Sequence, residues 1–171
     1  MLGGRASLVV GLLAVMNLSG QSNAVEQRTI AAVRFGRAWL GLAGALALHV
    51  TDEALTDFLS VYNPAALAIR ERLPYLRLPT FSFREWILGL STGILLLFVL
   101  APVAFRGSRW FTLLAMPFSV LMIANALGHI GSSLYMGRLM PGVCSAPVLL
   151  VAASLTFVYA RQASGKHNEK A

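Results

Sequence analysis

The stretch WILGLSTGILLLFVLAPVAF, Trp86–Phe105, runs for 20 residues without a charged side chain. About 20 apolar residues in a helix cross the hydrocarbon core of a bilayer, which is about 30 Å thick. Two later runs have the same character: residues 110–137, where His129 is the only group that titrates near neutral pH, and residues 139–160. These three runs predict three transmembrane helices.

The composition agrees with a membrane protein, because 57% of the residues are hydrophobic and only 12% are charged. Soluble domains carry about 25% charged residues. The net charge of +7 comes from basic residues that stand mainly at the ends of the apolar runs. No basic stripe interleaved with aromatic residues is present, so we expect no nucleic-acid partner. The single cysteine, Cys144, excludes an internal disulfide and a cysteine-rich zinc site.

An earlier run predicts a fourth span, but only 14 uncharged residues lie between Arg37 and Asp52. Either the helix begins near Ala31 with its arginines snorkelling, or Trp39 marks the interface and the helix continues to about Phe58. The fold class that follows is all-α, a polytopic membrane protein with a four-transmembrane-helix bundle. The predicted spans are about 31–58, 86–105, 110–136 and 140–160.

The remaining segments complete the predicted organisation. Residues 1–28 form a leader, disordered or signal-like, which we expect to be uncleaved, and residues 29–161 form the transmembrane domain. An outer-side loop or surface helix joins spans 1 and 2, with a helix over residues 65–73 that Asn63-Pro64 begins. Residues 162–171 form a polar cytoplasmic tail. Basic residues before span 1, between spans 2 and 3 and after span 4 place both termini in the cytoplasm, in a bacterial inner (plasma) membrane.

Polar residues inside the predicted spans mark a candidate site. His49, Asp52 and Glu53 share one helix face by their i, i+3, i+4 spacing, and Asn125 and His129 are one turn apart in the third span. The predicted topology brings both groups to the same depth near the outer leaflet. A central Asp costs about 2.5–3.5 kcal/mol on insertion scales, so such residues usually have a partner or line a cavity.

These five residues are the predicted catalytic set, with Asn125 orienting the others. His49, Glu53 and His129 are the predicted ligands of a divalent metal such as Zn, Mn or Fe, which would lower the pKa of a bound water toward about 7. The sequence therefore predicts a metal-dependent hydrolase acting on a lipid or other apolar substrate. Two alternatives stay open: a metal-free His/Glu acid–base isomerase, and a non-enzymatic lipid-binding, transport or assembly protein that uses the cluster as a polar lock or proton site.

The two polar blocks also carry a resemblance. His49-Val50-Thr51-Asp52-Glu53 resembles the motif of the HXXEE family of small integral membrane proteins, with Asp52 in place of the first Glu. The block from Asn125 to His129, followed by Pro141-Gly142, is similar to the second polar block of that family. The resemblance covers roughly residues 38–160. It implies a membrane protein with a His/carboxylate site and no particular reaction. From the apolar spans and the polar cluster themselves, we expect membrane lipid and an apolar small molecule as partners.

Overall fold

The computed structural model describes residues 3–168, and within this range every regular element is a helix. Side-chain placement is described from residue 21 to residue 165, except at residue 24. The elements are α1 (Gly3–Leu55), α2 (Leu59–Arg72), α3 (Phe83–Val99), α4 (Ala101–Phe105), α5 (Arg109–Met136) and α6 (Ala146–Asn168).

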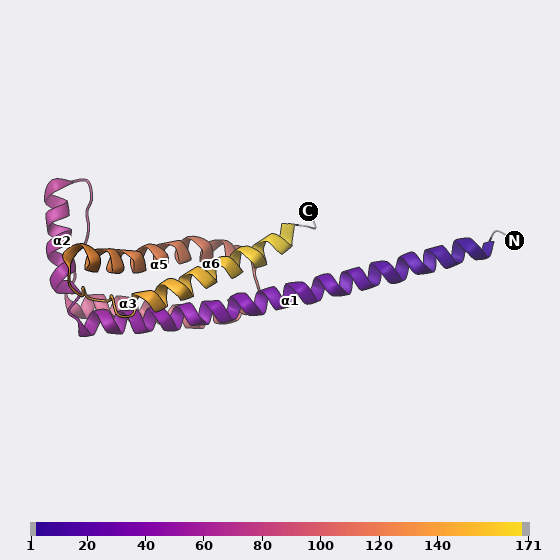
Figure 1. Ribbon diagram of the computed structural model, residues 1–171, viewed down its shortest axis with the longest axis horizontal. Coiled ribbons are helices and arrows are strands. Elements are labelled where there is room, and N and C mark those ends of the chain that lie inside the picture. The colour runs from indigo at the N-terminus through magenta and orange to yellow at the C-terminus, as the bar shows by residue number, and fades with distance from the viewer. Residues whose placement is uncertain (1–2, 169–171) are drawn as a thin grey trace.

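The longest helix, α1, forms the spine of the molecule. Its C-terminal half contacts α3, α4 and α6, and α6 also packs along α5. The short helix α2 stands across one end of this bundle, while the N-terminal part of α1 extends beyond the other helices (Figure 1). Two connections therefore lie near the C-terminal end of α1: the one through α2 to α3, and the link between α5 and α6.

Four helical stretches are long and apolar enough to cross a membrane: Gln21–Leu55, Phe83–Phe105, Arg109–Met136 and Ala146–Gly165. This agrees with the predicted all-α class and with four long apolar helices. The bounds differ most at the two ends of the chain. The stretch predicted as a leader is helical from Gly3 and continuous with the rest of α1, and α6 begins at Ala146 and reaches Asn168, into the predicted tail. Residues 169–171 of that tail lie outside the described residues.

The connection from α1 to α3 differs from the prediction. Asp57, whose φ is 55°, interrupts the helical conformation between α1 and α2. The expectation that Asn63-Pro64 begins a helix is wrong, because α2 already begins at Leu59 and includes Pro64. The Asn63 amide instead holds the following loop: its Nδ2 donates to the Phe81 carbonyl at 2.9 Å, and its Oδ1 accepts from the Phe81 N–H at 3.1 Å.

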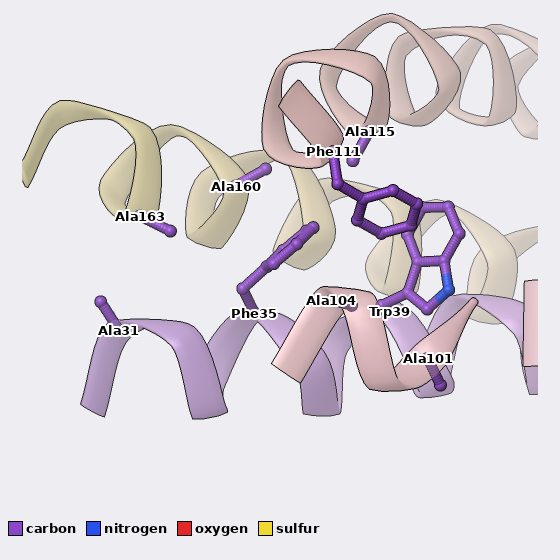
Figure 2. Close-up of a cluster of buried hydrophobic side chains, with 9 residues drawn as sticks. All are labelled: Ala31, Phe35, Trp39, Ala101, Ala104, Phe111, Ala115, Ala160 and Ala163. Atoms are coloured by element: carbon purple, nitrogen blue, oxygen red, sulfur yellow. The ribbon is translucent and has the colours of Figure 1, made fainter. Parts of the chain in front are cut away.

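An aromatic cluster fastens α1 to its neighbours. Phe35 and Trp39 on α1 meet Phe111 on α5, with the Trp39 and Phe111 ring centroids 4.7 Å apart in an edge-on arrangement (Figure 2). The Trp39 indole N–H donates to the Leu97 carbonyl of α3 at 2.8 Å. Trp39 is 4% exposed, so it is a core residue, and its predicted use as an interface marker does not describe its packing.

A stripe of mostly small residues lets α6 lie close to α1 and α5. Its members recur at alternating steps of three and four residues, the spacing of a packed helical seam. All are buried: Ala146, Leu149, Ala153, Thr156, Ala160 and Ala163. Small side chains permit close backbone approach, and the Thr156 hydroxyl reaches the Ala38 carbonyl on α1 at 3.0 Å. The packing along this seam fixes the position of α6 along the length of α1.

Candidate metal centre

Three side chains converge near the C-terminal end of α1. His49 and Glu53 lie one turn apart on α1, and His129 faces them from α5. Glu53 Oε1 is 3.1 Å from His129 Nε2 and 3.6 Å from His49 Nε2. One ligand atom from each side chain lies within 4.8 Å of the other two, and all three residues are buried. The structure therefore brings together the three residues that were predicted as metal ligands.

The backbone between α5 and α6 closes over this cluster. Gly142 has a φ of +81°, a left-handed conformation that side chains rarely adopt. A Cβ at Gly142 would lie 2.9 Å from the His129 imidazole and 3.0 Å from Glu53 Cγ. Only glycine lets the backbone pass this close to two of the three side chains, so the turn is shaped to the cluster.

The hydrogen bond to the outer nitrogen of His129 assigns its tautomer. His129 Nδ1 lies 2.6 Å from the carbonyl oxygen of Pro141. A carbonyl oxygen only accepts, so Nδ1 carries the proton and donates. In a neutral imidazole the other nitrogen is then an acceptor. In that neutral form His129 Nε2 presents a lone pair to the Glu53 carboxylate, another acceptor, whereas in the imidazolium form Nε2–H would donate to Glu53 Oε1 at 3.1 Å.

The outer nitrogen of His49 is assigned through Ser145. The Ser145 hydroxyl has one proton and lies 2.8 Å from the Asp52 carboxylate, 2.9 Å from His49 Nδ1 and 3.2 Å from the Gly142 carbonyl. Donation to the carboxylate is the strongest choice, and the hydroxyl oxygen then accepts from His49 Nδ1–H. His49 Nε2 is left as a lone pair. It is the one buried side-chain nitrogen or oxygen without a hydrogen-bond partner among the residues whose side chains are described.

Two imidazole lone pairs and a carboxylate thus face one another in a buried space. A metal ion between these acceptors relieves their repulsion, as does a proton on His129 Nε2, and an unpaired buried polar atom such as His49 Nε2 costs about 1–3 kcal/mol. Zinc bound to nitrogen and oxygen at about 2.0–2.1 Å in a tetrahedron separates its ligand atoms by about 3.3 Å. The two separations from Glu53 Oε1, 3.1 and 3.6 Å, bracket that value. The donor set fits a divalent metal with two histidines and one carboxylate.

Two of the five predicted site residues stand outside this triad. The Asp52 carboxylate accepts from both the N–H and the hydroxyl of Ser145, just before α6, at 2.9 and 2.8 Å. It therefore acts through Ser145 on His49, the outer-layer arrangement that orients a ligating histidine. Asn125 lies one turn before His129, but among the described residues it forms no side-chain hydrogen bond to the triad.

Ser145 is the site residue that the sequence analysis missed. A lone serine in an apolar run carries no pattern of its own. The available signals were Asp52, a carboxylate without an assigned partner, and Pro141-Gly142, which follows the second polar block and shortly precedes Ser145.

A cleft with a volume of about 280 Å³ reaches the site from one side. His129 and Asn125 lie in its wall, together with Phe58 and Val61 at the start of α2 and Met140 and Pro141 after α5. Most of this lining is apolar, and Phe58 packs against the His129 ring with centroids 5.7 Å apart. The cleft therefore offers an apolar route to one edge of the cluster.

The fold and site together define a helical protein with four long apolar helices and a buried His/carboxylate cluster. The family model for proteins of unknown function with an HXXEE motif matches residues 39–157, and the chain belongs to this family. That match confirms the resemblance carried by His49-Val50-Thr51-Asp52-Glu53. No curated protein and no solved structure gives a significant match to the chain.

Proposed function

We propose that this protein is a membrane-embedded metalloenzyme in which His49, Glu53 and His129 hold one divalent metal, with zinc the first choice. The observation that carries the proposal is the convergence of two imidazole nitrogens and a carboxylate, with His49 Nε2 buried and unpartnered. Asp52 with Ser145, and the Pro141 carbonyl, fix the two ring orientations from outside.

Placement in a bilayer is supported by the surface of the helices. Large apolar side chains are exposed along α3 and α5, among them Leu88, Leu95, Phe98, Leu114 and Leu121. Water would disfavour so many exposed apolar residues, whereas lipid accommodates them. We place the metal near the outer face and both chain ends in the cytoplasm of a bacterial inner membrane, following the distribution of arginines. Release from membranes by detergent, but not by high salt or alkali, tests the insertion.

The chemistry proposed for the site is hydrolysis of an ester or related bond in a lipid or other apolar substrate. A metal with three protein ligands keeps a fourth position for water and lowers its pKa toward about 7. The apolar cleft beside His129 supplies a route for the substrate. Water is the sole co-reactant: its oxygen joins the acyl carbon, and the leaving alcohol departs with a proton.

Metal content tests the binding site. Purified in detergent and supplied with Zn²⁺, the wild-type protein is expected to retain about one ion per chain after dialysis, and His49→Ala and His129→Ala close to none. Asp57→Asn removes an exposed carboxylate a few residues away and should retain the full ion. Equal metal content in the wild type and in both histidine variants would overturn the assignment.

A second function has one observation in its favour. His129 Nε2 and Glu53 Oε1 are 3.1 Å apart, a distance that a shared proton also satisfies, as metal-free acid–base isomerisation requires. Reaction of membrane lipid extract in H₂¹⁸O separates the two chemistries. Hydrolysis places ¹⁸O in a product that depends on Glu53 and on metal. An unlabelled isomeric product that is insensitive to chelator supports the isomerase and contradicts the hydrolase.

A further inference from the structure

A second concave site lies between α1 and α6, along the α1 segment that precedes the metal centre. It is a groove with a volume of about 750 Å³. One end carries Arg34, Arg37 and the aromatic ring of Tyr159, and the rest of the wall is apolar. The apolar part is formed by Ala38, Gly41, Val148, Val151, Ala152 and Leu155.

The helix directions order these residues along the groove. The bond from Thr156 to the Ala38 carbonyl fixes the register of the two helices. Tyr159 is therefore at the level of the arginines, and Val148 lies near the far end. From Pro147 to Tyr159, α6 rises about 18 Å at about 1.5 Å per residue. The groove is thus an elongated apolar slot with a cationic head.

The two arginines have no acidic partner. Among the described residues, the ion pairs involve only His49, His129 and Glu53, and both arginines are exposed. Arg161 adds a third cation, because it and Arg34 line an adjoining pocket. Five of the six acidic residues in the described range lie from residue 52 to residue 85, around the other end of α1, namely Asp52, Glu53, Asp57, Glu71 and Glu85. The sixth, Glu26, lies on α1 about two turns before Arg34, so the cationic end has one carboxylate nearby for its three arginines, and no ion pair joins them.

We propose that this groove binds one anionic glycerophospholipid, with its phosphate at Arg34 and Arg37 and an acyl chain along the apolar wall of α6. Arginine suits phosphate through its planar set of donors, and interfacial tyrosine supplies a hydroxyl at headgroup level. A free phosphate ion would leave the apolar length of the groove empty, and a lipid without net negative charge would leave two cations uncompensated. The proposal requires the bilayer placement proposed above and does not depend on the metal.

Native mass spectrometry of the detergent-purified full chain tests the site, with dioleoyl phosphatidylglycerol and dioleoyl phosphatidylcholine as probes. We expect one phosphatidylglycerol adduct per chain, retained better than phosphatidylcholine. Arg34→Gln/Arg37→Gln should weaken that adduct about 30-fold, from the usual contribution of each basic residue at an anionic surface. Arg106→Gln/Arg109→Gln is the matched control, because it removes two exposed arginines from the α4–α5 link, outside the groove.

A second pair of variants tests the apolar part without changing charge. A Cβ at Gly41 or at Gly44 would meet no atom within 4 Å outside its own helix backbone, but only Gly41 lines the groove. Gly41→Leu should therefore displace the lipid and Gly44→Leu should not, while both keep the metal content of the wild type. Equal phosphatidylglycerol binding by the two arginine double variants, or by the two leucine variants, would overturn the proposal. Loss of metal with lipid binding intact would count against the metal centre alone.

Discussion

Two buried clusters on α1, about four turns apart, are built on opposite principles. The cluster around Phe35 and Trp39 is apolar and satisfied, since the Trp39 and Phe111 rings pack edge-on (Figure 2). The Trp39 indole N–H also donates to the Leu97 carbonyl. The cluster around His49 and Glu53 holds mutually facing acceptors, one of them unpaired. Packing alone explains the first, whereas the second has the donor set and the spacing of a site that could hold a metal ion. The comparison predicts that stability depends on the aromatic cluster and metal binding on the polar one.

The largest effect is expected from Glu53→Gln. The variant should lose its metal, falling from about one ion per chain to near zero, because the carboxylate is the charged ligand. Without metal it should be as stable as the wild type or more so, since the new amide N–H can donate to a histidine lone pair. Thermal unfolding in chelator, followed by circular dichroism, measures this. A metal-free variant less stable than the wild type by about 2 kcal/mol or more would favour a polar lock.

Phe35→Ala should reverse that pattern. Truncation of a fully buried phenylalanine typically costs about 3–5 kcal/mol in unfolding free energy, because packing contacts are lost and a cavity remains. Metal content per folded chain should stay unchanged, since no atom of the polar cluster is involved. Unfolding in detergent, with metal analysis of the folded fraction, gives both numbers. Phe35→Leu retains part of the packing and should lose less stability. A large loss of metal in Phe35→Ala with intact folding would contradict the separate roles of the two clusters.

Ser145→Ala tests whether the outer hydrogen bonds tune the metal site. Removing the hydroxyl frees His49 Nδ1 and one Asp52 contact, and loss of such a partner lowers metal affinity about 10–100-fold. Competition with a chromogenic zinc chelator measures the affinity. Ser119→Ala is the control, because Ser119 is equally buried but bonds only within its own helix, to Ala115 at 2.7 Å. An equal change in both variants would remove Ser145 from the site.

The smallest effect is expected from two glycine variants, which distinguish backbone strain from steric crowding at the site. Gly137 and Gly142 both have positive φ, but only Gly142 has neighbours within reach of a Cβ. Gly137→Ala should cost about 1–2 kcal/mol in stability from the left-handed backbone alone, with metal affinity unchanged. Gly142→Ala should add a loss of metal affinity, because the methyl group displaces His129 or Glu53. Zinc titrations of the two variants decide the point, and matching affinities would contradict the packing of the turn on the cluster.

Much of the fold was predictable because long apolar runs have few alternatives. Trp86–Phe105 and residues 110–136 correspond closely to helices. The ends were less accessible: the link from Gly137 to Ser145 is apolar, and composition could not separate it from the helix that follows. Asn63-Pro64 does not begin a helix, and the Asn63 side chain instead bonds to the Phe81 backbone, a tertiary contact that local sequence does not reveal.

The candidate site was also only partly predictable from the sequence. The approach of His49, His129 and a carboxylate at residue 52 or 53 was predictable from helical spacing plus topology, since those two facts place them on facing surfaces at one depth. Which of Asp52 and Glu53 faces His129 was not predictable, because residues one position apart point in directions that differ by about 100° around a helix. The partnership of Asp52 with Ser145 depends on a link 93 residues away, so no local pattern carries it.

X-ray absorption at the zinc edge is the most direct test of the central claim that His49, Glu53 and His129 form a metal site. The wild-type protein, stripped and reloaded with one equivalent of Zn²⁺, should show two imidazole ligands at about 2.0–2.1 Å and additional oxygen scatterers. Glu53→Gln, treated in the same way, should show neither the imidazole ligands nor the oxygen scatterers. A zinc spectrum of oxygen ligands only, or no bound zinc in the wild type, would contradict the account.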